Sequence, residues 1–363
     1  MDSIFRVAEQ FKQQGRIIDI REFGNGNINT TFLVTQDAKL EKHFILQRIN
    51  SQVFRRPELV VQNMRICTDH MRQRLNRALP GRRWEVLEML SAQNGQDFWL
   101  DADGSFWRAI SFIKGSQSFD TIADIEHARE VGCALGIFHT LLSDLPAERL
   151  ADTLKGFHIM PCYFRHYADV LAKCNVGKSP GINYCLQFIR ERNAWAHVLE
   201  NARMQGILPL RPIHGDPKVS NIMIDTATRQ AISIVDLDTV KPGLIHYDIG
   251  DCLRSGCNTL GEETEQWQEV YFDLDLCKAI LQGYLSMARE FLTENDFFFI
   301  YDSIRLIAFE LGLRFFTDYL EGNVYFKVRH LEHNLARALV QFNLTRSIEL
   351  QEETIRSIIR EIK

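Results

Sequence analysis

The sequence lacks the long apolar runs and cysteine pairs that mark several large classes of protein. No apolar stretch approaches the ~20 residues that a membrane-spanning helix needs, so no membrane partner is expected. Residues 1–11 mix apolar and charged side chains, as a short amphipathic helix does and a signal peptide does not. The eight cysteines are scattered without a C-x-x-C pair, which leaves zinc and redox motifs unsupported. Such cysteines suit a reducing compartment, and we expect a cytoplasmic protein.

The sequence also lacks clusters of positive charge. The net charge is -5 and no basic tract or arginine-rich arm is present, which argues against nucleic acid as the main partner. Hydrophobic residues make up 45% of the chain and charged residues 25%, as in a folded soluble protein. A length of 363 residues suggests two domains or lobes.

One stretch carries most of the chemistry. Residues 214–225 begin as a polar loop and end as a short apolar run, and a second apolar run ends in the carboxylate of Asp236. A polar turn over residues 226–230 separates the runs, which predicts a β-hairpin. A hairpin brings its outer ends together, so Asn221 and Asp236 should be neighbours. Oxygen-bearing side chains gathered at one point suit Mg²⁺, which proteins hold with one or two groups plus phosphates.

The spacing Asp-x-x-x-x-Asn is typical of the catalytic loop of protein-kinase-like enzymes. In this interpretation Asp216 accepts the proton of a substrate hydroxyl, Asn221 and Asp236 hold Mg²⁺, and Lys218 places a cation beside the transferred phosphoryl group. The alternative is an ordinary loop and hairpin in which Asp and Asn serve as caps. The joint presence of all four residues favours the kinase.

The first part of the chain offers a nucleotide site. Strands over residues 16–20 and 31–34 flank a Gly/Asn-rich loop whose backbone N–H groups could cover the phosphates of ATP, although a plain hairpin turn has the same composition. The candidate residues of this loop are Gly24, Asn25, Gly26, Asn27, Asn29 and Thr30.

The third strand, residues 43–49, lacks the lysine that kinases use there to bind nucleotide phosphates. We expect Arg48 to replace it. Gln47 points to the opposite face, since side chains alternate along a strand, so only one of the two can face the nucleotide. Glu58, at the start of a helix over residues 57–77, is a weak candidate partner for the strand cation.

These elements predict an α+β, protein-kinase-like fold with two lobes. Residues 1–114 form an N-lobe with a small antiparallel sheet, further strands being expected at 83–90, 97–100 and 107–113. Backbone groups of Ser111, Phe112 and Ile113 could hydrogen-bond an adenine edge where the lobes join. Residues 115–363 form a mainly helical C-lobe that carries the catalytic loop and the acceptor site. Its helices are expected at 122–145, 183–205, 264–291, 295–321, 327–345 and 347–362.

Four further positions in the C-lobe carry expectations. Asp248 is predicted to brace the catalytic loop through backbone N–H groups, and Pro242 with Gly243 to form a turn. Asp238 either contacts the acceptor substrate or stiffens its loop. Arg314 and Asp318 share a helix face and either bind sugar hydroxyls or pair with each other.

The motif of residues 214–216, with Asn221 and Asp236, resembles the aminoglycoside phosphotransferase and choline kinase superfamily, and the resemblance runs from about residue 16 to 340. Within it, the flanking segments are most similar to the N-acetylhexosamine 1-kinases; these segments are residues 46–50, 218–221, 234–243, 247–251 and 310–322.

The resemblance implies ATP- and Mg²⁺-dependent phosphorylation of an amino sugar, N-acetylglucosamine or N-acetylgalactosamine, at its anomeric hydroxyl. It assigns the base to Asp216 and the metal to Asn221 and Asp236. The sequence departs from the pattern at Pro217, which removes an N–H beside the base, and at the absent strand lysine. Other acceptors (an aminoglycoside, choline, homoserine) and a pseudokinase without turnover remain alternatives.

Overall fold

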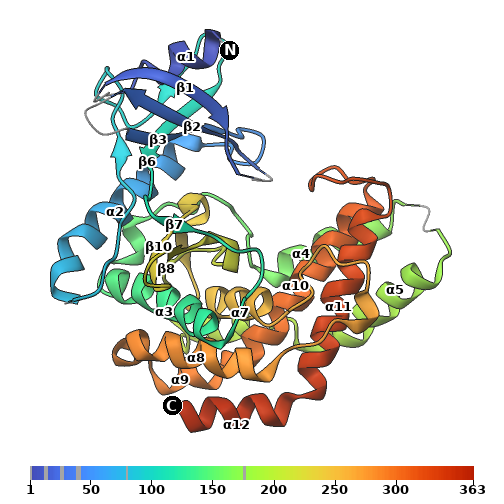
Figure 1. Cartoon of the computed structure of the whole chain (residues 1–363). Coiled ribbons are helices and arrows are strands. Elements are labelled where there is room, and N and C mark those ends of the chain that lie inside the picture. The colour runs from blue at the N-terminus through green and yellow to red at the C-terminus, as the bar shows by residue number, and fades with distance from the viewer. Residues whose placement is uncertain (1, 12–14, 25–27, 38–41, 79–80, 175–176) are drawn as a thin grey trace.

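The chain forms a small lobe built on an antiparallel sheet and a larger, mainly helical lobe, as a computed structural model shows (Figure 1). The structure describes residues 2–11, 15–24, 28–37, 42–78, 81–174 and 177–363. Within this part of the chain, none of the helices combines the length and the apolar character that a membrane span requires.

The N-lobe sheet has the strand order β1-β2-β3-β6-β4, and the short strand β5 also pairs with β6. Its strands are β1 (Arg16–Glu22), β2 (Thr30–Asp37), β3 (Lys42–Ile49), β4 (Met89–Leu90), β5 (Trp99–Leu100) and β6 (Phe106–Ser111). The neighbouring strands pair antiparallel, as expected. Most of the strand expected over residues 83–90 has no regular secondary structure, and only its last two residues join the sheet.

The two faces of this sheet are covered by different helices. Phe44 and Leu46 of β3 lie in the cluster that also contains residues of α1 (Asp2–Ala8). Ile45 and Ile49, which alternate with them, belong to the main core together with residues of α2 (Pro57–Ala78). The alternation along β3 therefore places Gln47 on the α2 face and Arg48 on the α1 face.

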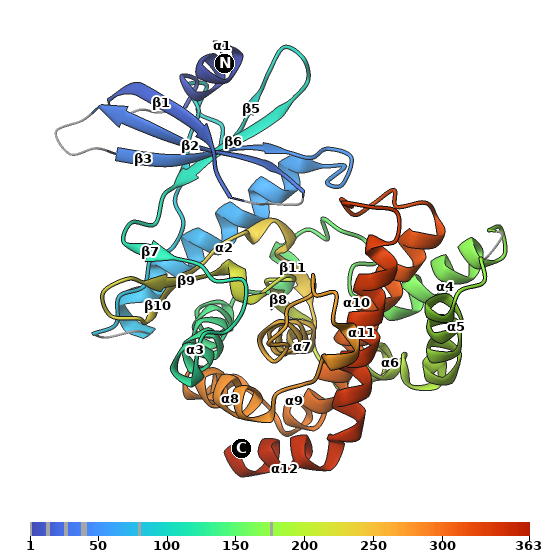
Figure 2. The same cartoon turned by 45° about the vertical axis from the view of Figure 1, so that its right-hand side comes forward.

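Helix α2 lies between the sheet and the C-lobe (Figure 2). Asn63 on this helix donates from Nδ2 to the carbonyl oxygens of Ala151 and Val240, both at 2.8 Å, and its Oδ1 accepts from the N–H of Ala151 at 2.9 Å. These backbone groups belong to the C-lobe. The apolar core accordingly runs without a break from the sheet through α2 into the C-lobe.

Two small sheets support the catalytic segment of the C-lobe. The expected hairpin is present as β9 (Ile222–Asp225) and β10 (Ala231–Ile234), extended by β7 (Ser116–Gln117). The expected turn at Pro242 and Gly243 is wrong, since both lie in β11 (Lys241–Gly243), which pairs with β8 (Arg211–Ile213). Proline is tolerated there because Pro242 faces Pro212 in a two-stranded ladder, which has only edges.

The rest of the C-lobe is helical, and its main contacts are between α3 and α8 and between α10 and α11. The interval expected as one helix over 183–205 is divided by a 3-10 turn between α5 and α6. The helices are α3 (Ile125–Leu142), α4 (Met160–Leu171), α5 (Pro180–Arg192), α6 (Val198–Met204), α7 (Ile245–Gly256), α8 (Leu274–Ala288), α9 (Glu294–Phe298), α10 (Ile300–Leu320), α11 (His333–Leu350) and α12 (Glu352–Ile362).

Candidate active site

The catalytic-loop candidate follows β8 and is held in place by Asp248 on α7. The two carboxylate oxygens of Asp248 accept from the N–H groups of His214, at 2.7 Å, and Gly215, at 2.8 Å. His139 on α3 approaches the same carboxylate at 2.8 Å. The predicted bracing role of Asp248 is thereby confirmed. Gly215 has a φ of +86°, and a Cβ there would lie 2.8 Å from the carbonyl oxygen of Thr239, so only glycine fits.

His214 ties this loop to the end of β10. Its Nε2 lies 2.9 Å from the carbonyl oxygen of Val235, and its Nδ1 accepts from the N–H of Asp216 at 3.2 Å. This pattern requires the neutral imidazole with its proton on Nε2. Burial lowers the pKa of His214, although nearby carboxylates oppose this, and so favours the same state.

Asp216, Lys218 and Asn221 form one hydrogen-bonded group. Lys218 Nζ lies 2.9 Å from Oδ2 of Asp216, and Asn221 Nδ2 lies 2.8 Å from the Asp216 carbonyl oxygen and 3.3 Å from Oδ2. Burial works to raise the pKa of Asp216, but the Lys218 ammonium outweighs it and holds the pKa below its usual value. Asp216 is therefore a carboxylate near neutral pH. Because the amide nitrogen of Asn221 faces Asp216, its oxygen is directed elsewhere.

Asp236 follows β10 in the left-handed conformation, with φ 62° and ψ 55°, which Asp tolerates better than most residues. The N–H of Val235 donates to the Asn221 carbonyl oxygen at 2.9 Å, so the outer ends of the hairpin meet as expected. Burial first, and then the charge of Asp238, raise the pKa of Asp236 to about 7. This local excess of negative charge fits a divalent cation, which the oxygens of Asp236 and Asn221 would hold.

The Gly/Asn-rich loop reaches this region through Asn29. Its Nδ2 donates to Oδ2 of Asp238, and its Oδ1 accepts from the N–H of Asn50 at 2.9 Å. Gly24 has a φ of +76° at the start of the loop. Three of the candidate phosphate-covering residues, Asn25, Gly26 and Asn27, lie outside the described residues.

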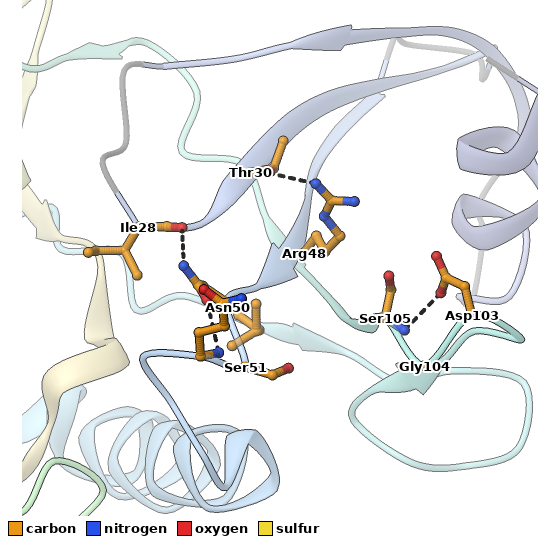
Figure 3. Close-up of a pocket in the computed structure, with 10 residues that line it drawn as sticks. Ile28, Thr30, Arg48, Asn50, Ser51, Asp103, Gly104 and Ser105 are labelled. Carbon is orange, nitrogen blue, oxygen red and sulfur yellow. Dashed lines mark hydrogen bonds between the residues drawn. The ribbon is translucent and has the colours of Figure 1, made fainter. Parts of the chain in front are cut away.

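Arg48 faces away from the catalytic loop. Its Nη2 lies 3.4 Å from the Thr30 hydroxyl and its guanidinium sits 5.9 Å from the ring of Trp107. Figure 3 shows it beside Thr30 at one end of a polar pocket of about 370 Å³, with Asn50 and Ser105 on the other walls. Because Gln47 occupies the α2 face, Arg48 contacts Thr30 of the Gly/Asn-rich loop and not the catalytic loop, and its replacement of the strand lysine stays a prediction.

The segment proposed to bind adenine is partly engaged within the sheet. The N–H of Ser111 donates to the Glu88 carbonyl oxygen at 2.8 Å, and its hydroxyl accepts from the N–H of Glu88 at 2.9 Å. The Ile113 carbonyl accepts from Ser116 Oγ at 2.8 Å. The backbone groups of Phe112 take no part in these hydrogen bonds. The centroid of its ring lies 6.0 Å from that of Phe23.

Two of the predicted acceptor residues are buried and bound within the protein, Asp238 to side chains and Asp318 mainly to backbone N–H groups. Asp238, 3% exposed, pairs with Arg108 and accepts from Asn29, both in the N-lobe. Asp318, also 3% exposed, accepts from the N–H groups of Tyr325 at 2.7 Å and Phe326 at 3.0 Å, and so shapes the loop after α10. These contacts leave Arg314 as the acceptor-site candidate of the three.

Arg314 on α10 lies in a ring of aromatic side chains. Its guanidinium is 5.2 Å from the ring of Phe157, 5.3 Å from that of Tyr163 and 5.5 Å from that of Phe326. It forms an ion pair with Glu310, one turn earlier, at 3.9 Å rather than with Asp318. The side chain is 16% exposed, so this cation is held in place and still open to a ligand.

Sequence reasoning missed His158, which links Glu310 to the catalytic loop. Its Nδ1 lies 2.9 Å from Oε1 of Glu310 and its Nε2 2.8 Å from the Gly215 carbonyl oxygen. Both partners are acceptors, so both ring nitrogens carry protons. Burial opposes that charge, but Glu310 outweighs it and raises the pKa of His158. No spacing in the chain marks this contact, since 57 and 152 residues separate the partners.

Further charged groups of both signs surround Asp216. Asp251 and Arg254 on α7 form a buried ion pair at 2.8 Å, and both act electrostatically on Asp216. Burial, reinforced by Asp216, raises the pKa of Asp251. Within the described residues, Oε2 of Glu310 and Oδ2 of Asp251 have no hydrogen-bond partner. Each is a buried acceptor without a partner, which is uncommon in a folded protein.

The sequence from residue 19 to residue 287 matches the model of the phosphotransferase enzyme family, APH. The chain belongs to this family. Its protein-kinase-like fold is the one predicted, with an antiparallel sheet in the N-terminal part and helices dominating the C-terminal part. The members of this family are phosphotransferases, and the loop of Asp216 and Asn221 lies within the matched residues.

Solved structures share the fold of this phosphotransferase at low sequence identity. A microcompartment-associated aminopropanol kinase is 14% identical with a TM-score of 0.66, and 98% of each chain is covered. A choline kinase from Cryptosporidium parvum is 14% identical with a TM-score of 0.58, covering 99% of each chain. An amicoumacin kinase solved with AMP-PNP, Ca²⁺ and its antibiotic is also 14% identical, with a TM-score of 0.58 over 96% of this chain and 93% of the other.

Proposed function

We propose that this phosphotransferase transfers the γ-phosphoryl group of ATP, with Mg²⁺, to the anomeric hydroxyl of N-acetylglucosamine or N-acetylgalactosamine. The observation that supports phosphoryl transfer best is the grouping of Asp216, Lys218, Asn221 and Asp236 on one loop and the hairpin that follows it. A loop that only capped a hairpin would have no need for a lysine beside its carboxylate.

Each of these side chains has a distinct task in the proposed reaction. Asp216, kept ionised by Lys218, orients the sugar hydroxyl and takes its proton late in the transfer. Lys218 is partly exposed and sits where its charge can follow the phosphoryl group. Asn221 and Asp236 would hold Mg²⁺, which neutralises charge on the phosphates when bound. The transfer is direct, without a covalent intermediate on the enzyme.

The acceptor side favours a neutral molecule with several polar groups. Charged groups of both signs are paired there, Arg254 with Asp251 and Arg314 with Glu310. Arg314 can donate to the carbonyl oxygen of an acetamido group. The unpartnered oxygens of Glu310 and Asp251 are buried in this structure and would accept from hydroxyl or amide N–H groups only after a side-chain rearrangement.

The same geometry disfavours a quaternary ammonium acceptor. Such ligands bind on the faces of aromatic rings. In this chain the guanidinium of Arg314 already lies over Phe157, Tyr163 and Phe326. A second cation would have to displace Arg314 or sit beside it, which like-charge repulsion opposes.

A coupled ATP-consumption assay over a panel of acceptors tests the proposal. The panel contains N-acetylglucosamine, N-acetylgalactosamine, glucose, kanamycin, choline, ethanolamine and homoserine. We expect the highest kcat/KM with one of the two N-acetylhexosamines. Faster turnover of an amino alcohol or aminoglycoside would overturn the acceptor assignment. ATP binding without consumption on any acceptor, from a preparation that binds both ligands, would instead indicate a pseudokinase.

A further inference from the structure

Residues 43–49 of β3 contain no lysine that could bind nucleotide phosphates, and the neighbouring strand β6 supplies a cation instead. Gln47 stands on the α2 face of β3, and its cross-strand partner on β6 is Arg108. Oε1 of Gln47 accepts from Nε of Arg108 at 3.0 Å and from Nη2 at 2.7 Å. A guanidinium therefore lies one strand away from the position where kinases place their lysine.

Arg108 is the largest of the completely buried side chains, with 0% exposure. A buried guanidinium is costly unless it is paired and hydrogen-bonded. Its counter-ion is Asp238, itself 3% exposed, which comes from the segment after β10 in the C-lobe. The ion pair therefore joins the sheet of one lobe to the segment that carries the metal-site candidate Asp236.

Helix α2 does not supply the counter-ion that a kinase helix supplies to its lysine. The group that α2 presents to Arg108 is the thioether of Met64, 3.6 Å from Nη1. Glu58, the candidate from the sequence, pairs with Arg56 at the exposed start of α2 at 2.9 Å. Compared with the usual kinase arrangement, the cation is on β6 and not on β3. Its carboxylate partner is Asp238 and not a residue of the helix.

Asp238 also accepts a hydrogen bond from the side-chain amide of Asn29, a residue of the Gly/Asn-rich loop. One carboxylate thus links the sheet and the phosphate-covering loop of the N-lobe to the Asp236 segment of the C-lobe. Because Asp236 is in the strained left-handed conformation, its side chain depends on the neighbouring backbone being held. The Arg108 charge also acts directly on Asp236.

We propose that Arg108, with Gln47, replaces the strand lysine as a positioning residue for the nucleotide and metal site. It acts through Asp238, which binds Asn29 and lies two residues after Asp236 in the same segment. It does not touch the phosphates itself, because its side chain is buried and its N–H groups face Gln47, Asp238 and Met64. The inference rests on the proposed use of MgATP and is independent of the acceptor.

The test compares Arg108→Gln with a double variant that moves the cation back, Gln47→Lys with Arg108→Gln. Nη2 of Arg108 contacts both Gln47 and Asp238. A lysine at position 47 would therefore stand beside Asp238. We expect Arg108→Gln to raise KM for MgATP by about 10- to 100-fold, the usual cost of losing a group that orients a metal ligand. KM for the sugar should stay within about twofold of wild type, and the double variant should recover at least about tenfold of kcat/KM for MgATP.

Two readouts separate positioning from simple stability. One is the unfolding temperature without ligand, and the other is its rise on adding MgATP, which needs no acceptor. Arg65→Gln is the matched control, because it breaks another N-lobe Arg–Asp pair, with Asp97, far from Asp238 in the chain. It should lower the unfolding temperature and keep the MgATP-induced rise. A wild-type protein without that rise would refute the use of MgATP, not the role of Arg108.

Three outcomes would overturn the role of Arg108. The first is an Arg108→Gln variant that is less stable but has the wild-type KM for MgATP. The second is a double variant that regains stability without regaining nucleotide affinity. The third is a larger loss in Arg48→Gln than in Arg108→Gln, which would return the role to Arg48. If Arg108→Gln does not fold, Arg108→Lys keeps the buried charge and should still raise KM for MgATP, since lysine cannot bridge Gln47 and Asp238 together.

Discussion

At the scale of single residues, the proposed mechanism makes turnover depend most on Asp216. Its carboxylate is kept ionised by Lys218 and oriented by Asn221. Asparagine has nearly the same shape but cannot accept the proton, so Asp216→Asn should lose about 10²- to 10⁴-fold in kcat. Steady-state ATP consumption measures the loss, and the MgATP-induced rise in unfolding temperature should persist. Turnover near the wild-type rate would remove Asp216 from the mechanism.

Asp236 should govern the metal requirement instead. Without its carboxylate the cation keeps one protein ligand, Asn221, and the phosphates. In Asp236→Ala the Mg²⁺ concentration for half-maximal activity should rise by at least about tenfold, equivalent to ~1.4 kcal/mol of binding free energy. A magnesium titration at saturating ATP measures it. An unchanged titration curve would place the metal site elsewhere.

Residues close together in the chain could be predicted from spacing, and those brought together by the fold could not. The contacts of Asp216 with Lys218 and Asn221, and of Asn221 with the end of β10, follow from a loop and one hairpin. Arg108 and His158 act through partners more than 55 residues away. Arg108 did leave one signal, because a lone arginine inside an apolar strand needs a buried counter-ion.

At the scale of elements, the start of α7 contains a buried histidine, His246, whose protonation makes stability depend on pH. His246 is 1% exposed, and its Nε2 lies 3.0 Å from the Asp296 carbonyl oxygen. Burial lowers its pKa from 6.5 to about 4. The unfolded chain therefore binds this proton at a higher pH than the folded chain does. The stability that depends on neutral His246 is complete above pH 6.5 and is lost as the pH falls towards 4.

Replacing this histidine should flatten the acid limb of stability. Between pH 7 and pH 5 the wild-type protein should lose about 2 kcal/mol of unfolding free energy through this residue alone. The amide nitrogen of glutamine can replace Nε2 in His246→Gln. This variant should lose about 2 kcal/mol less unfolding free energy than the wild type between the two pH values. Denaturant unfolding at the two pH values measures the difference. Equal losses in both proteins would show that another group titrates in this range.

The packing of α3 on α8 is a second feature at this scale. A Cβ on Gly283 would lie 1.9 Å from the carbonyl oxygen of Arg129, and one on Gly132 would lie 1.9 Å from that of Ile280. The helices can approach this closely because both residues are glycine. Helix α3 carries His139, which contacts Asp248. The packing of α3 on α8 therefore helps to hold Asp248, and through it the catalytic loop, in place.

Gly283→Ala should force the two helices apart and destabilise the protein by about 1–3 kcal/mol or more, as overpacking does. Denaturant unfolding measures the change. The matched control is Gly181→Ala in α5, where a new Cβ would make ordinary contact with Leu339 at 3.4 Å. That variant should be neutral or slightly stabilising. Similar effects at both sites would contradict the close approach.

The elements themselves were predictable where local pattern decides them. The β9–β10 hairpin has two apolar runs around a polar turn, and the long helices have the helical period. Strands β8 and β11 escaped prediction because each has three residues with a proline in the middle, a composition that normally signals a turn. They form only because the catalytic segment brings them side by side.

At the scale of the whole molecule, the two lobes are joined by more than the chain between them. Asn63 on α2 binds backbone groups of the C-lobe, and Arg108 pairs with Asp238 across the same boundary. The apolar core is continuous through α2. Sequence patterns predicted both lobes, but they did not reveal that one helix and one arginine couple them, because these contacts join segments about 90 to 180 residues apart.

The product of the reaction tests the central claim most directly. The protein would be incubated with MgATP and N-acetylglucosamine or N-acetylgalactosamine, and the product examined by phosphorus NMR with proton coupling. We predict a phosphate ester whose phosphorus couples to the anomeric proton, and no such product from Asp216→Asn. A phosphate on another hydroxyl, or no sugar phosphate while an amino alcohol is phosphorylated, would contradict the account.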